Sequence, residues 1–223
     1  MKVKVCGMTS IDQMHQLGDM GVEFAGLIFY PKSPRYVLKH GVAGADVKKA
    51  KLKPYKVGVF VDASYDEVMK QVDDFGLDMV QLHGHETPYE CSKIADYIHV
   101  IKAFRFMDND HVSWMLKDYY QDADMFLFDT GVTPAKDEHG KMVYGGTGRK
   151  FNWNRLRGLD VGKPFFLSGG IEPSDAGLVK EFMKDPVAKD LFVVDINSRF
   201  ESSPGVKDMA KVQAFINELH NHE

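Results

Sequence analysis

Eight short runs rich in β-branched and aromatic residues alternate with longer stretches along this chain of 223 residues. The longer stretches place apolar residues three and four positions apart, as amphipathic helices do, for example at residues 11–20, 65–75 and 209–219. Strands that alternate with helices pair in parallel, because each connection must cross over the sheet. The predicted strands are residues 2–6, 24–29, 56–61, 79–83, 99–104, 125–129, 164–168 and 192–196.

Eight strand–helix units within about 200–250 residues are the number that closes a (β/α)₈ TIM barrel. No segment rich in Pro, Ser or Gly divides the chain, so a single α/β domain covering residues 1–223 is predicted. An open doubly wound sheet is the alternative, since it has the same alternation.

One connection, residues 130–150, is longer than the others. It is either a binding loop at the functional end of the barrel or a solvated excursion.

Charge and cysteine content limit the possible partners. The net charge is −4, from 28 basic and 32 acidic residues, which argues against a general nucleic-acid or membrane surface but permits a local cationic pocket. Two cysteines fit a reducing compartment. The first residues alternate charged and apolar types and lack a signal peptide's apolar segment, and no window reaches 18 apolar residues. We therefore expect a cytoplasmic protein.

Reactive side chains gather at the predicted carboxyl ends of the strands, which is the functional face of such barrels. We expect Gln81, His83 and Asp195 at these ends to contact a substrate. Arg35 follows Ser-Pro after the second strand, and its guanidinium is suited to bidentate capture of a carboxylate. A surface arginine is the alternative interpretation.

Cys6 ends the first strand, directly before a glycine. Strand alternation places Lys4 and Cys6 on one face and Val3 and Val5 on the other, so the valines would face the helices and Lys4 and Cys6 the barrel interior. A cation beside a thiol favours the thiolate, which is the basic form. The alternatives are a buried, inert cysteine and an ion-paired lysine, for which Asp195 is a candidate partner.

Asp129 closes the apolar run at residues 125–128. Desolvation at the end of a buried strand raises the pKa of a carboxyl group and makes it a better acid near neutral pH, although a turn or N-cap aspartate is the common alternative. The first and sixth strands are three apart in a ring of eight. Cys6 and Asp129 can therefore face each other across the mouth, as a base and an acid for aldose–ketose isomerisation.

Glycines and small polar residues follow the last two strands, where barrels commonly bind phosphate through backbone amides. Gly169, Gly170, Asn197 and Ser198 are predicted to form this site, and Gly146 in a Gly-Gly-Thr-Gly run can add a donor. The histidines, glutamate and cysteine at residues 83–91 match no standard zinc spacing, so no metal is expected.

The chain resembles the phosphoribosylanthranilate isomerase family in motifs that occur in order at the strand ends. These motifs are KVCGMT at residues 4–9, GLIF at 26–29, SPR at 33–35, VGVFV at 57–61, VQLHG at 80–84, FDT at 128–130, GGTGRKFNW at 145–153, LSGGI at 167–171 and DINS at 195–198, followed by Glu201, Pro204, Gly205, Lys207 and Asp208. The segment between residues 130 and 145 is longer than the family pattern.

This resemblance implies a (β/α)₈ barrel that converts N-(5-phosphoribosyl)anthranilate to carboxyphenylamino-deoxyribulose phosphate in tryptophan biosynthesis, without a cofactor. It assigns the general base to Cys6, the general acid to Asp129 and the arginine after strand two to Arg35. Two other functions stay open. One is a related phosphate-binding barrel isomerase, whose chemistry usually pairs two aspartates. The other is a silent barrel that only binds a phosphorylated ligand. Either a monomer or a homodimer fits the sequence.

Overall fold

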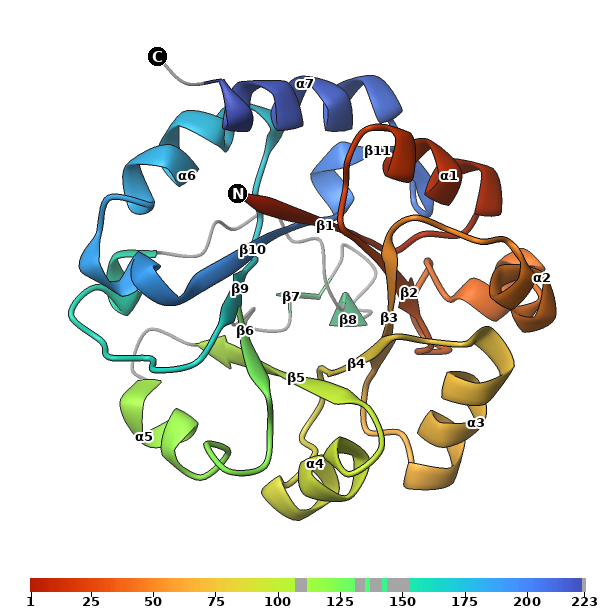
Figure 1. The fold of residues 1–223 in the computed structure, drawn as a ribbon, viewed down its shortest axis with the longest axis horizontal. Helices are drawn as coiled ribbons and strands as arrows, with labels where there is room; N and C mark the ends of the chain where they lie inside the picture. Colours follow the sequence, from red (N-terminus) through yellow and green to blue (C-terminus); the bar gives the residue numbers. More distant parts are fainter. Residues whose placement is uncertain (107–111, 131–134, 137–141, 144–152, 222–223) are drawn as a thin grey trace.

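The computed structural model describes residues 1–106, 112–130, 135–136, 142–143 and 153–221. Eight parallel strands close into a barrel in the order β1-β10-β9-β6-β5-β4-β3-β2, so the predicted TIM barrel is confirmed and the open sheet is excluded (Figure 1). The barrel strands are β1 (Lys2–Cys6), β2 (Phe24–Ile28), β3 (Tyr55–Phe60), β4 (Met79–Leu82), β5 (His99–Phe106), β6 (Met125–Thr130), β9 (Phe165–Leu167) and β10 (Leu191–Ile196).

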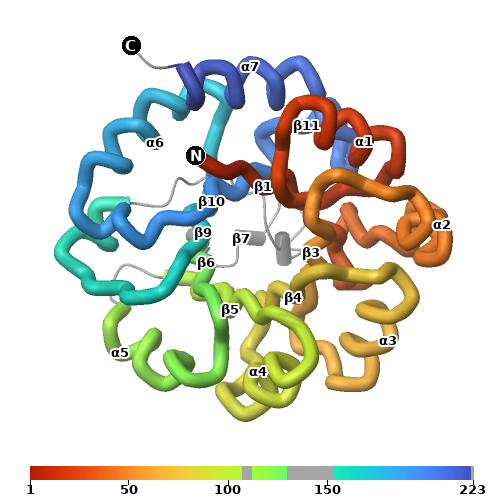
Figure 2. The backbone as a smooth tube through the Cα atoms, viewed as in Figure 1, coloured from red at the N-terminus to blue at the C-terminus, as the bar shows by residue number. Residues whose placement is uncertain are grey.

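Helices surround the barrel on all sides, and the chain enters the barrel through β1 while α7 packs at the rim beside α1 and α6 (Figure 2). The α-helices are α1 (Ile11–Asp19), α2 (Gly44–Lys49), α3 (Tyr65–Phe75), α4 (Pro88–Ala95), α5 (Val112–Lys117), α6 (Ala176–Phe182) and α7 (Met209–His220). Short 3₁₀ helices are η1 (Val37–His40), η2 (Trp153–Leu156), η3 (Pro173–Asp175), η4 (Pro186–Asp190) and η5 (Ser198–Phe200). Two small antiparallel pairs are β7 (Ala135–Lys136) with β8 (Met142–Val143), and β11 (Glu201–Ser203) with β12 (Val206–Lys207).

Local sequence signals explain where the best-defined helices begin and end. Helices α3 and α4 both start with capping boxes, Ser64 with Glu67 and Thr87 with Glu90, which satisfy otherwise unpaired backbone donors. Gly76 ends α3 in the left-handed conformation, which glycine adopts without strain. The α3 boundaries agree with the predicted helix at residues 65–75, whereas most strand ends differ by one or two residues. Among the described helices, none is long and apolar enough to span a bilayer.

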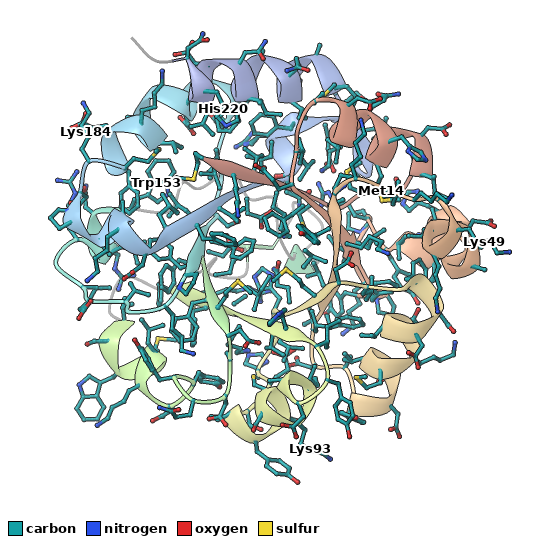
Figure 3. All side chains as sticks on the ribbon, in the orientation of Figure 1. Met14, Lys49, Lys93, Trp153, Lys184 and His220 are labelled. Atoms are coloured by element: carbon teal, nitrogen blue, oxygen red, sulfur yellow. The ribbon has the colours of Figure 1, made fainter. Side chains whose placement is uncertain are left out.

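The apolar core has two parts. Outward-facing strand residues such as Val3 and Val5 pack against inward-facing helix residues such as Met14, while lysines like Lys49 and Lys93 lie exposed at the perimeter (Figure 3). A second cluster fills the amino-terminal half of the barrel interior. Its buried residues are Phe24, Val57, Met79, Ile101, Ala103, Met125, Leu127, Phe166 and Val193.

A polar layer lies on the carboxyl-terminal side of this second cluster, which forms an apolar plug in the barrel. Lys4 is fully buried, and its Nζ donates to Asp195 Oδ1 and to Gln81 Oε1, both at 2.9 Å. The Lys4–Asp195 pairing anticipated from the sequence is therefore confirmed, and the two residues are direct neighbours across β1 and β10. Burial alone would lower the pKa of Lys4, but Asp195 and Cys6 outweigh this effect and raise it, so Lys4 is a buried cation.

Removing this cation is predicted to destabilise the fold. Lys4→Met leaves the Asp195 carboxylate buried without its partner, which costs about 3–5 kcal/mol of unfolding free energy. The double variant Lys4→Met/Asp195→Leu removes both charges and should recover most of that loss. Urea unfolding of the three proteins measures the difference, and a single variant as stable as the wild type would contradict the importance of the pair.

Candidate active site

Because every second side chain of a strand faces inward, the polar lining continues from the middle of the barrel to its mouth. Cys6 follows Lys4 on the inner face of β1, and His83 follows Gln81 at the end of β4. Asp129, two residues after the inward-facing Leu127, lies near the end of β6. Strands β1 and β6 are three apart in the observed order, so Cys6 and Asp129 lie on opposite sides of the mouth, as the sequence predicted.

The Cys6 thiol lies inside the barrel. A Cβ atom added to Gly26 on β2 would come within 2.9 Å of Cys6 Sγ and 3.2 Å of Lys4 Cε, so the glycine leaves room for both side chains. Burial raises the pKa of the Cys6 thiol, and the nearby cations Lys4 and Lys207 lower it by less. The thiolate expected from the sequence is therefore not the resting form, because the effect of burial on the thiol outweighs the opposing effect of Lys4.

The Asp129 carboxyl group faces a histidine. Asp129 Oδ2 lies 3.3 Å from His83 Nε2, and the two side chains keep 25% and 16% of their surfaces exposed. The other ring nitrogen, His83 Nδ1, lies 2.9 Å from Gln81 Nε2. Both amide atoms of Gln81 are thus engaged within the protein, by Lys4 and by His83.

A cavity of about 480 Å³ opens beside His83 at the ends of β4 and β5. Arg105, which sequence reasoning missed, lines this cavity and pairs in strand register with Asp129. The signal was present in the sequence, because alternation after the inward-facing Ala103 puts Arg105 on the inner face. Lys102 faces the opposite way and forms a buried ion pair with Glu86 at 2.7 Å.

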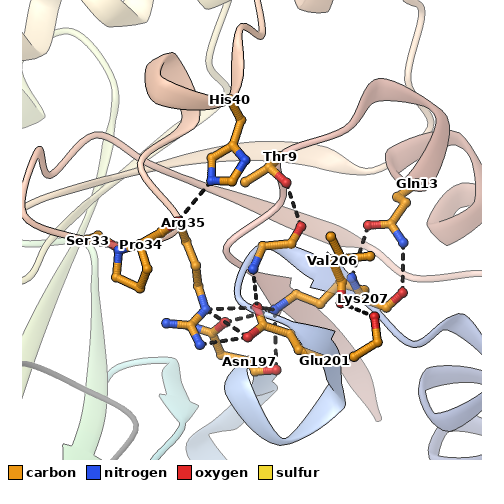
Figure 4. A network of polar contacts seen from close by, with 12 residues as sticks. Thr9, Gln13, Ser33, Pro34, Arg35, His40, Asn197, Glu201, Val206 and Lys207 are labelled. Carbon is orange, nitrogen blue, oxygen red and sulfur yellow. Dashed lines mark hydrogen bonds and ion pairs between the residues drawn. The ribbon is translucent and has the colours of Figure 1, made fainter.

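Arg35 is held in place by a carboxylate of the protein itself. Its Nε and Nη2 donate to the two oxygens of Glu201 at 2.8 and 2.6 Å, and Lys207 Nζ donates to Glu201 Oε1 at 2.6 Å and Asn197 Oδ1 at 2.8 Å (Figure 4). Burial would raise the pKa of Glu201, but the two cations lower it. Arg35 is therefore no free surface side chain. The roles of Glu201 and Lys207 could not be predicted from the sequence, because isolated charges in a loop do not indicate which partners they meet.

Gly7 brings Arg35 and Asn197 close to the end of β1. Its φ is +76°, and an added Cβ would lie 2.6 Å from Arg35 Cδ and 2.9 Å from Asn197 Oδ1. No other residue type fits this backbone conformation and this space without displacing its neighbours.

The residues predicted to bind phosphate follow two adjacent strands. Gly169 and Gly170 come after β9 with φ values of +97° and +71°, and Asn197 and Ser198 come after β10, where η5 begins. Because β9 and β10 are neighbours, the backbone amides of the residues that follow these strands lie at the same part of the mouth. Gly146, the fifth predicted residue, lies outside the described residues.

The residues considered for a metal site have other partners. His85 Nδ1 lies 3.2 Å from Asp62 Oδ2, Glu86 pairs with Lys102, and Cys91 is buried in α4. Within the described parts of the chain, no group of three or more His, Cys, Asp or Glu side chains is placed to hold a metal ion.

Gly7→Ala is predicted to be more harmful than Gly21→Ala, which serves as a matched control. Both glycines have positive φ, so both substitutions cost about 1–2 kcal/mol of backbone strain. Only Gly7 has neighbours within 4 Å of the added methyl group, and overpacking adds about 1–3 kcal/mol. Equal unfolding free energies for the two variants would show that Gly7 is not needed for the approach of Arg35.

Comparison with known proteins places the chain in a family. Residues 3–218 match the family model of N-(5'phosphoribosyl)anthranilate (PRA) isomerase. The N-(5'-phosphoribosyl)anthranilate isomerases of Parabacteroides distasonis and Phocaeicola vulgatus are 34% and 35% identical to it, over 98% of this chain and 93% and 98% of theirs.

Solved structures agree with this match. Phosphoribosyl anthranilate isomerase from Thermotoga maritima superimposes with a TM-score of 0.77 at 30% identity, over 98% of both chains. That enzyme is also described as dimeric. A phosphoribosyl anthranilate isomerase with a TM-score of 0.74 and 26% identity, over 98% of this chain and 97% of its own, was solved in complex with reduced 1-(o-carboxyphenylamino)-1-deoxyribulose 5-phosphate. With a family model covering nearly its whole length and full-length relatives above 30% identity, this chain belongs to the phosphoribosylanthranilate isomerase family.

Proposed function

We propose that this chain isomerises N-(5'-phosphoribosyl)anthranilate to 1-(2-carboxyphenylamino)-1-deoxyribulose 5-phosphate, a step of tryptophan biosynthesis, with Cys6 as the general base and Asp129 as the general acid. Family membership supports the reaction. The observation that carries the assignment of residues is the position of a thiol and a carboxyl group on opposite sides of one barrel mouth.

The proposed reaction is an Amadori rearrangement. Asp129 protonates the furanose ring oxygen, and the ring opens to an iminium ion. Cys6, as thiolate, then removes the C2′ proton to give an enolamine, which tautomerises to the ketone. The iminium ion accepts the electron pair released at C2′, so the substrate provides its own electron sink. Each positioned proton transfer typically contributes about 10²–10⁴-fold to the rate.

Arg35 is proposed to bind the anthranilate carboxylate. Glu201 accepts from Nε and from one N–H group of Nη2 and holds the guanidinium plane fixed, which leaves both N–H groups of Nη1 and the second one of Nη2 for a ligand. The phosphate is proposed to bind to the backbone amides at Gly169, Gly170 and Ser198, close to Asn197. The positive φ values of both glycines support this, since such backbone conformations form concave sets of amide donors.

Other aspects of the protein remain predictions. The substrate is a small phosphorylated molecule, and neither nucleic acid nor a membrane is an expected partner. The relative from Thermotoga maritima is dimeric, and for this chain a monomer and a homodimer both stay open. The cytoplasmic location, the single domain and the substrate contacts of Gln81, His83 and Asp195 are likewise proposals.

The proposed acid and base are tested by Cys6→Ser and Asp129→Asn. Each variant is expected to lose about 10²–10⁴-fold in kcat, because one proton transfer loses its group, while the thermal unfolding curve shows that the fold persists. Loss of the anthranilate fluorescence measures turnover. Wild-type kcat in a folded, purified Asp129→Asn sample would rule out the assigned acid.

Arg35→Met is expected to raise KM more than it lowers kcat, since the lost interaction is with a non-reacting carboxylate. Steady-state kinetics with varied substrate concentration separates the two parameters. Arg157→Met is a suitable control, because Arg157 is about half exposed and pairs with Asp185 outside the proposed site. The role of Arg35 is wrong if its substitution changes neither KM nor kcat.

The raised pKa of the Cys6 thiol predicts that its thiolate forms only at alkaline pH. Burial places this pKa above the value of an ordinary thiol, about 8.5, so the ultraviolet absorbance of the Cys6 thiolate should still be rising at about pH 8.5. The difference in absorbance between the wild type and Cys6→Ser separates this residue from Cys91 and the tyrosines. A Cys6 thiolate signal that has already reached a plateau at about pH 7 would contradict a buried thiol at this position.

A further inference from the structure

We infer that Gln81 sets the tautomer of His83, so that the proton of the neutral ring is on Nε2 and points toward the Asp129 carboxyl group. The effect of this tautomer on catalysis rests on the proposed role of Asp129 as the acid. The tautomer itself follows from three consecutive contacts across the barrel interior, Lys4 to Gln81, Gln81 to His83 and His83 to Asp129.

The first contact fixes the orientation of the Gln81 amide. The Lys4 ammonium group has three donors and no acceptor, so only the amide oxygen of Gln81 can face it, and the Nζ–Oε1 distance is 2.9 Å. Lys4 cannot turn away, because it is fully buried and its Nζ also donates to Asp195. A flipped amide would place its NH₂ group against the buried ammonium, with neither able to accept.

The second contact fixes the proton on the histidine ring. With its oxygen on Lys4, Gln81 presents Nε2 to His83 Nδ1 at 2.9 Å, and an amide nitrogen only donates. His83 Nδ1 must therefore accept and carry no proton. The ring is then neutral with its proton on Nε2, because an imidazolium would put an N–H group against the amide N–H of Gln81.

The third contact connects this proton to the proposed acid. His83 Nε2 is buried, lies 3.3 Å from Asp129 Oδ2, and has no aligned hydrogen-bond acceptor in the part of the chain that is described. Catalytic hydrogen bonds are often long or misaligned without substrate and tighten when it binds. Once Asp129 has given up its proton, an Nε2–H donor stabilises the resulting carboxylate. An imidazolium there would instead keep Asp129 ionised and unable to act as an acid.

Charges around His83 act in both directions. The carboxylates of Asp129 and Asp195 favour a protonated ring, whereas Lys4 and the cations Lys102 and Arg105, which line the adjoining cavity, oppose it. The direct contact with the donating amide of Gln81 decides between them, because it excludes a proton on Nδ1 altogether.

His85 provides an internal control two residues further along the chain. Its Nδ1 lies 3.2 Å from Asp62 Oδ2, and an ionised carboxylate only accepts. His85 Nδ1 is therefore expected to be protonated, the opposite of His83 Nδ1.

Nitrogen-15 NMR of the imidazole rings in the intact, substrate-free protein tests the assignment. Spectra of His83→Gln and His85→Gln samples identify the two sets of signals. We expect His83 Nδ1 to resonate as an unprotonated nitrogen with its proton on Nε2 around neutral pH, and His85 Nδ1 to resonate as a protonated one. A protonated Nδ1 on His83 would overturn the inference, whatever the activity of the protein.

Gln81→Glu tests the cause. The new carboxylate accepts from Lys4 and also from a protonated His83 Nδ1, so His83 should resonate with protons on both ring nitrogens around neutral pH. The cation beside Asp129 then favours the ionised form of that acid, so kcat should fall. Gln81→Met, which offers no donor, should let both neutral tautomers of His83 form. His85 should be unchanged in both variants.

An unchanged His83 spectrum in Gln81→Glu would contradict the role of Gln81. These outcomes are separate from a failure of the proposed function. A wild-type protein with the expected tautomer but no isomerase activity would refute the function and leave the tautomer standing. An active protein with Nδ1 protonated would refute only the inference.

Discussion

The interior of the barrel depends on the contacts that the buried ammonium group of Lys4 makes with its neighbours. A cation without water is costly unless it is paired and hydrogen-bonded. Asp195 and Gln81 supply those partners, and Cys6 lies close enough for its pKa to respond to the charge. Because the ammonium group can only donate, it determines which atom each neighbour presents to it. The orientations of the side chains at the mouth are thereby set by the polar layer beneath them.

The side chains inside the barrel thus form successive layers with different functions. The apolar plug in the amino-terminal half excludes water and supports the polar layer of Lys4, Gln81 and Asp195. Above that layer, the groups proposed for chemistry keep part of their surfaces open, as Asp129 does with 25%. The Arg35–Glu201–Lys207 cluster holds the loops after β2 and β10 together in the same way, with one carboxylate between two cations.

Much of this could be predicted from the sequence. The strand–helix rhythm predicted the barrel, and alternation along β1 predicted that Lys4 and Cys6 face inward, because both depend on periodicity within one element. The bidentate contact between Arg35 and Glu201 could not be predicted, since it joins residues 166 positions apart. The raised pKa of Cys6 was missed for a related reason: the sequence indicates a neighbouring lysine but not the completeness of burial. Arg105 was overlooked although its strand position marked it as inward-facing.

The proposed reaction requires a thiol and a carboxyl group that act from opposite sides on one substrate. A crystal structure of this protein with a reduced, unreactive product analogue tests it most directly. We expect Cys6 Sγ in contact with the C2′ position, the Asp129 carboxyl group next to the oxygen it protonates on the opposite side, and the phosphate at the amides after β9 and β10. An analogue bound with either Cys6 or Asp129 out of contact would contradict it.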